Sequence, residues 1–290
     1  MAKVWLVTGS SRGLGREIVA AALAAGDRVV ATARKPEQLG DLVQQYGDRV
    51  MPVALDVTDE GAAREAVAAA VAKFGRLDVV VNNAGYANLA SVEDIEGADF
   101  RAQLETNLMG VVNVSKAAVP VLREQGSGRI IQVSSLGGRV ATPGLAAYQA
   151  AKWAVGGFSE VLAQEVAPLG IKVTVLEPGG MRTDWAGSSM TVPSISEPYQ
   201  QTVGVLAAML GSTEVAPAGD PKKVAQAVLE VAELDEPPVR LLLGSDAVGY
   251  AAVVAQARAA EDEKWRYISV STDHVDADAA SLDPMGQVQR

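Results

Sequence analysis

Short apolar runs alternate with alanine-rich segments of helical length along most of the chain. Several runs are continuously apolar, as expected for strands that are buried on both faces of a sheet. Strands that alternate with helices indicate parallel pairing, because the chain returns through a helix packed on the sheet. The pattern predicts an α/β fold, a doubly wound parallel (Rossmann-like) sheet with helices on both faces. We expect strands at residues 4–7, 28–33, 50–55, 79–81, 129–135, 171–176 and 239–243, and helices at residues 13–25, 37–46, 60–74 and 145–168.

The sequence changes character after Pro178. Residues 186–221 mix Gly, Ser, Pro and Thr, and a long irregular insertion at the carboxyl edge of such a sheet favours a substrate lid. Residues 266–290 are rich in acidic and small polar residues, which predicts a flexible C-terminal tail. We therefore expect one Rossmann-type domain over residues 1–265, lid included, followed by the tail. The large lid side chains, which either close an apolar pocket or form the lid's own core, are Met190, Val192, Tyr199, Leu206 and Met209.

The composition limits the classes of partner that the chain is expected to bind. Its 290 residues include 35 acidic and 25 basic side chains, a net charge of -10. A field of that sign repels phosphate backbones and anionic lipid surfaces, so we expect neither a nucleic acid nor a membrane partner. No apolar run reaches the ~20 residues of a membrane span. The absence of Cys favours a cytoplasmic location, and with one His we expect no metal site.

A glycine-rich turn at residues 9–15 lies between the first expected strand and the first expected helix. Glycines there allow a tight turn and let a pyrophosphate approach the helix N-terminus, whose free amides favour anions. At the end of the second expected strand the chain reads Ala33-Arg34-Lys35, where an acid would bind a ribose hydroxyl. Arg34, together with Arg12 in the turn, suits a 2′-phosphate, so we expect NADP(H) rather than NAD(H).

Tyr148 and Lys152 lie four residues apart in an expected helix, so their side chains project from the same face. A neighbouring ammonium stabilises a phenolate, which predicts a lowered pKa for Tyr148 and proton exchange near neutral pH. Hydride arriving at a carbonyl carbon leaves charge on the oxygen, which then needs a hydrogen-bond donor and a proton source. Ser135, at the end of an expected strand, can hold that oxygen while Tyr148 supplies the proton.

Residues 3–184 contain an ordered set of motifs: Thr8-Gly9-x-x-x-Gly13-x-Gly15, Asn82-Asn83-Ala84-Gly85, Asn107, Ser135, Tyr148-x-x-x-Lys152 and Pro178-Gly179. With this set, the segment resembles the classical short-chain dehydrogenase/reductase (SDR) family. This sequence departs from the family pattern at Gln149, where the family often has a small residue, and at Glu177, where the family often has Asn. The resemblance implies a catalytic set of Asn107, Ser135, Tyr148 and Lys152, in which Asn107 anchors a water. The cofactor contacts expected from the turn and the resemblance are Gly9, Ser11, Arg12, Gly13, Leu14, Gly15, Arg34, Asp56, Val57, Asn83, Ala84, Gly85, Tyr148, Lys152, Pro178, Gly179, Met181 and Thr183.

The function expected from these features is NADP(H)-dependent hydride transfer between nicotinamide and a ketone, aldehyde or secondary alcohol. Arg182 is the one basic residue near the expected pocket wall, which favours a fairly apolar substrate. By resemblance, the enzyme is a homo-oligomer, a dimer or a tetramer. Two alternatives remain open: a regulatory protein that binds NADP without turnover, and a hydrolase that uses Ser11 of a Gly-x-Ser-x-Gly elbow with His274 as base.

Overall fold

The sheet of the computed structural model is wholly parallel. The structure describes residues 2–183, 190–212 and 216–283, so parts of the expected lid and tail lie outside the described residues. Seven strands follow the order β3-β2-β1-β4-β5-β6-β7, and the order reverses between β1 and β4, where such sheets bind ligands. The predicted doubly wound sheet is confirmed. Its strands are β1 (Val4–Val7), β2 (Arg28–Ala33), β3 (Val50–Ala54), β4 (Val79–Asn82), β5 (Gly128–Val133), β6 (Ile171–Pro178) and β7 (Arg240–Leu243).

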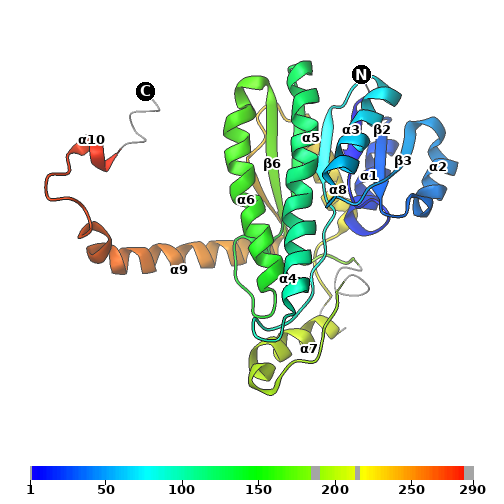
Figure 1. Ribbon diagram of the computed structural model, residues 1–290. Helices are drawn as coiled ribbons and strands as arrows, with labels where there is room; N and C mark the ends of the chain where they lie inside the picture. The colour runs from blue at the N-terminus through cyan, green and yellow to red at the C-terminus, as the bar shows by residue number, and fades with distance from the viewer. Residues whose placement is uncertain (1, 184–189, 213–215, 284–290) are drawn as a thin grey trace. The chain divides into compact units, whose positions relative to one another are not determined.

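Helices cover both faces of the sheet, and the side chains of β1 divide between two cores. Trp5 and Val7 pack with residues of α1, α2 and α8, whereas Leu6 packs with residues of α3, α5 and α6. Figure 1 shows α5 and α6 side by side over one face. Alternation of neighbouring residues between two buried faces explains why the strands are continuously apolar. The helices of this unit are α1 (Gly13–Ala24), α2 (Gly40–Tyr46), α3 (Glu60–Phe74), α4 (Gly97–Leu104), α5 (Gly110–Gln125), α6 (Ala146–Val166), α7 (Val205–Gly211) and α8 (Pro221–Glu233).

The chain divides into two compact units, residues 1–249 and residues 250–290. Helix α9 (Ser245–Val270) runs from the first into the second, and α10 (Ala279–Leu282) belongs to the second. The predicted tail, 266–290, lies in the second unit. No helix within the described ranges is both long enough and apolar enough to cross a bilayer.

Candidate active site

A cavity of about 650 Å³ lies at the carboxyl edge of the sheet. Side chains that follow five strands, β1 to β5, meet there with the end of β6 and the start of α6. This is the edge at which parallel α/β sheets place their ligands. All the predicted catalytic and cofactor residues line this cavity except Gly15 and Asn107.

The glycine turn is tied to the end of β4. Gly9 adopts a φ of +66°, a backbone conformation that residues other than glycine rarely adopt. Thr8 Oγ1 accepts hydrogen bonds from the backbone amides of Asn83 (2.9 Å) and Ala84 (3.0 Å). Asn83 Nδ2 donates to the carbonyl of Thr8 at 2.9 Å. The Asn83 amide group therefore fixes the shape of the turn, while Gly15 packs behind the turn against Gly9.

The turn leads into a helix terminus that is ready for an anion. Helix α1 has neither a side-chain cap nor an acidic residue in its first turn. Neither a capping side chain nor a nearby carboxylate therefore competes with a bound anion for the first backbone amides of the helix. Arg12, which precedes the helix, and Arg34, just beyond β2, line the same end of the cavity and are both exposed. Asp56 and Val57, beyond β3, complete this end.

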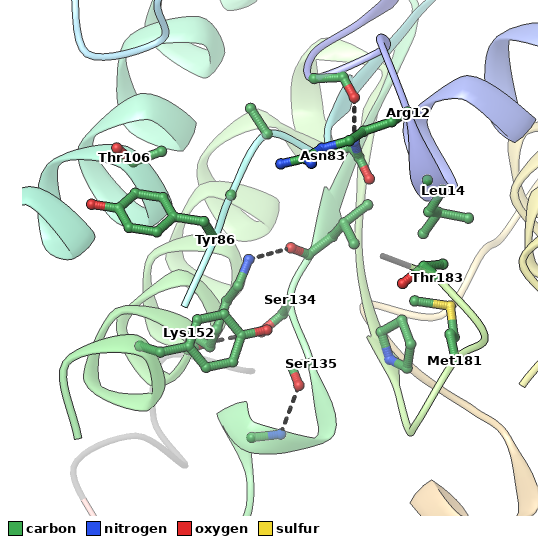
Figure 2. A pocket seen from close by; sticks show the side chains of 18 of the residues that line it. Arg12, Leu14, Asn83, Tyr86, Thr106, Ser134, Ser135, Lys152, Met181 and Thr183 are labelled. Atoms are coloured by element: carbon green, nitrogen blue, oxygen red, sulfur yellow. Dashed lines mark hydrogen bonds between the residues drawn. The ribbon is translucent and has the colours of Figure 1, made fainter. Parts of the chain in front are cut away.

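Ser135, Tyr148 and Lys152 line the same cavity, and Figure 2 shows Ser135 and Lys152 apart from Arg12. Ser135 begins a tight turn after β5, and its Oγ accepts from the Gly137 amide at 3.0 Å. Tyr148 and Lys152 project from the buried face of α6, as predicted. Lys152 Nζ donates to the Val133 carbonyl at 2.8 Å and lies 5.6 Å from the centre of the Tyr148 ring. The three side chains thus line one cavity from a strand end and a helix.

Burial sets the protonation of this group. It raises the pKa of Tyr148 to about 12, although the hydrogen bond with Ser135 acts in the opposite direction. It lowers the pKa of Lys152 to about 8, because the buried ammonium loses hydration. The prediction that Lys152 lowers the pKa of Tyr148 is therefore wrong, because desolvation of the buried phenolate dominates. Tyr148 holds its proton at neutral pH.

Asn107 lies behind the cavity wall. It is fully buried in a π-helical turn, Glu105–Met109, and such turns occur often at functional sites. Its Nδ2 donates to the carbonyls of Tyr86 (2.9 Å) and Gln103 (2.8 Å), and its Oδ1 accepts from the Tyr86 amide. The side chain therefore holds the segment after β4 in place. A carbon built on Gly85 would lie 2.5 Å from Asn107 Oδ1 and 3.5 Å from Lys152 Nζ, so Asn107 and Lys152 are close neighbours.

The loop after β6 forms part of the cavity wall. Met181 and Thr183 line it, and Thr183 Cβ lies 3.9 Å from a carbon built on Gly13 (Figure 2). Asp246, in the first turn of α9, fixes the loop because its Oδ2 accepts from the Gly180 amide at 2.8 Å. Its other oxygen is buried without a hydrogen-bond partner.

Several lining residues were missed by the sequence analysis. Most follow the ends of β4 and β5, so a search of the residues beyond each strand end would have found them. Among the expected lid residues, Met190, Tyr199 and Leu206 pack on the cluster that contains Tyr148, whereas Val192 and Met209 are exposed. The missed lining residues include Tyr86, Asn88, Thr106, Ser134, Leu136, Gly137, Val140, Thr142, Leu145 and Thr191.

The chain is similar to known oxidoreductases along nearly its whole length. It is 62% identical over 273 residues to oxidoreductase BOA17 of Botryotinia fuckeliana, across 94% of this chain and 100% of that protein. A short-chain dehydrogenase from Streptomyces avermitilis superposes with a TM-score of 0.89 at 39% identity, across 94% of this chain and 100% of that one. A Burkholderia cenocepacia short-chain dehydrogenase in complex with NADP superposes with a TM-score of 0.71 at 28% identity, across 91% and 97%. The family model described as short chain dehydrogenase matches residues 3–192. With the predicted motifs gathered in one cavity, the chain belongs to the short-chain dehydrogenase/reductase family and is an oxidoreductase.

Proposed function

We propose that this oxidoreductase reduces a fairly apolar ketone or aldehyde with NADPH, or catalyses the reverse oxidation of a secondary alcohol. The observation that carries the proposal is the convergence of Ser135, Tyr148 and Lys152 on the same cavity as the glycine turn and Arg34. A proton source and a phosphate-binding end in one cavity are the two requirements of hydride transfer to a carbonyl.

The cavity fits a dinucleotide phosphate. The uncapped N-terminus of α1 suits the pyrophosphate, and the guanidinium groups of Arg12 and Arg34 suit an additional 2′-phosphate. The NADP-bound Burkholderia relative supports the same choice. In this proposal Asp56 and Val57 contact the adenine, Lys152 the nicotinamide ribose, and Thr183 the nicotinamide amide. The bound cofactor supplies the hydride.

The residues of the chain handle the oxygen of the substrate. The Ser135 hydroxyl donates a hydrogen bond to the carbonyl oxygen, and Tyr148 transfers its phenolic proton to that oxygen as negative charge develops. A phenol whose pKa is raised to about 12 is protonated at neutral pH, as a proton donor in the reductive direction must be. From behind the cavity wall, Asn107 holds the backbone of Tyr86 in place, and it lies close to Lys152. In this proposal Asn107 also anchors a water that returns a proton, although both hydrogens of its side-chain amide already donate to backbone carbonyls.

The decisive experiment measures oxidation of NADPH and NADH by the purified protein with a panel of ketones and aldehydes. We expect turnover with NADPH and apolar carbonyl compounds. Binding of NADPH without oxidation across the panel would instead support a regulatory binding protein. The Ser11 hydrolase has little support, because no histidine lies among the described residues that line the cavity.

Assembly and location are part of the same proposal. We infer a cytoplasmic homo-oligomer, a dimer or a tetramer, as the family resemblance implies. Light scattering coupled to size-exclusion chromatography tests the assembly, since a monomer at micromolar concentration would contradict it.

A further inference from the structure

We propose that Gln149 forms a second polar contact with the substrate. The cavity would then select carbonyl compounds that carry a neutral hydrogen-bond acceptor, such as an ester oxygen, a few bonds from the reacting carbonyl. The inference rests on the proposed function, which supplies the reacting carbonyl beside Ser135 and Tyr148. It adds a specificity-determining residue to that site.

The orientation of the Gln149 amide is fixed by the loop that it holds. Its Oε1 accepts a hydrogen bond from the Thr142 backbone amide at 2.8 Å. A flipped amide would place an NH₂ group against that N–H, two donors facing each other, so the oxygen must point to Thr142. The Nε2 group must then point the other way. No described residue provides an acceptor for Nε2.

The Nε2 group points into the cavity near Ser135. Gln149 lines the cavity, yet the whole residue is only 8% exposed, so its amide is largely removed from bulk water. A carbon built on Gly137 would lie 3.1 Å from Gln149 Nε2 and 3.4 Å from Ser135 Oγ. The two polar groups therefore border one small space, and the absence of a side chain at Gly137 keeps this space open. A substrate whose carbonyl contacts Ser135 places the atoms next to that carbonyl beside Nε2.

A donor that is largely removed from water and has no protein partner is unfavourable, because it gives up hydration without gaining a protein hydrogen bond. A substrate acceptor relieves that cost, and a purely hydrocarbon substrate does not. The acceptor should be neutral, since the charged residues that line the described cavity are Arg12, Arg34, Asp56 and Lys152. The first three belong to the proposed cofactor end, and Lys152 already donates to Val133.

The test compares ethyl 3-oxobutanoate with 2-heptanone, a ketone of the same chain length that lacks the second acceptor. The measured quantity is the ratio of kcat/KM values for the ester and the ketone. In Gln149→Met the chain length is kept and the donor is lost, so we expect this ratio to fall about tenfold, the effect of one neutral hydrogen bond. Gln164→Met changes an exposed glutamine of the same helix and should leave the ratio unchanged.

A second variant separates donation from anchoring of the Thr142 loop. Gln149→Glu keeps an oxygen for the Thr142 amide and replaces the donor with a second acceptor. At the alkaline end of the activity range, where the carboxylate is ionised, we expect the ester to ketone ratio to fall at least as far as in Gln149→Met. A purely structural role would lower both kcat/KM values equally, so an unchanged ratio in both variants overturns the proposal.

A binding measurement distinguishes failure of this inference from failure of the proposed function. Calorimetry gives the affinities of the cofactor-loaded protein for ethyl 3-hydroxybutanoate and 2-heptanol. Tighter binding of the hydroxy ester that is lost in Gln149→Met supports the inference even if neither ketone is reduced. Equal affinities, or a preference that persists in Gln149→Met, refute it whatever the activity.

Discussion

Glu177 stabilises the site through a buried ion-pair network, and replacing it should cost a large part of the protein's stability. Its side chain is fully buried. Arg139 Nε donates to Glu177 at 2.6 Å, and Arg240 Nε donates at 3.0 Å. Arg240 also donates to Glu160 at 2.8 Å and to the Gly138 carbonyl at 3.4 Å. The network joins the turn after Ser135 to β6, β7 and α6.

Glu177→Gln removes the charge and turns an NH₂ group toward two guanidinium donors. Breaking a buried ion pair costs about 3 to 5 kcal/mol, because the remaining partner is left uncompensated. The side chains of Arg139 and Arg240 are 34% and 24% exposed, so both can be hydrated in part, which favours the lower end. We therefore expect a loss of about 3 kcal/mol and a fall in the thermal midpoint of about 6 °C or more.

Urea and thermal unfolding of the purified variants measure this effect. The matched control is Glu236→Gln, which breaks an ion pair of 2.8 Å between Lys172 and a carboxylate that is 84% exposed. We expect no measurable shift in the control, since exposed pairs are hydrated in both states. The reasoning is refuted if Glu177→Gln unfolds with the wild-type midpoint, or if the two variants lose equal stability.

Two further predictions concern the basic residues of the cavity. The folded pKa of Lys152, lowered to about 8, lies below the unfolded value of about 10.4, so the unfolded state binds more protons between these values. The free energy of unfolding should therefore rise from about pH 8 to about pH 10.4 relative to Lys152→Met in urea titrations, and parallel profiles would contradict the burial argument. For Arg34→Ala, we expect the ratio of kcat/KM for NADPH to that for NADH to fall about tenfold or more, because one charge-assisted phosphate contact is lost. An unchanged ratio would refute the role of Arg34.

Local patterns were sufficient for most of the fold. Apolar runs located β1 and β2 to the residue, and the helix at residues 60–74 was also placed correctly, because Asp59 caps it and Gly75 ends it. The boundaries shifted where turn geometry decides them. The expected strand 129–135 ends at Val133, and Ser135 belongs to the turn that follows.

The tertiary surroundings of the site could not be read from spacing. The proximity of Tyr148 and Lys152 was predicted from their spacing of one helical turn. The direction in which the tyrosine pKa shifts, however, depends on how deeply the surrounding structure buries the phenol. Glu177 was noticed only as a departure from a motif, because Arg139 and Arg240 come from distant segments. Gln149 was noticed in the same way, and its role depends on the Thr142 amide that orients it.

The central claim is that the Tyr148 phenol is the proton donor, and Tyr148→Phe tests it most directly. The change keeps the ring and removes the proton, whereas Tyr46→Phe makes the same change on α2 outside the cavity and serves as control. With saturating NADPH and a ketone that the wild type reduces, we predict a loss of turnover of about 100-fold or more with NADPH affinity retained. Turnover near the wild-type rate in Tyr148→Phe would contradict the account.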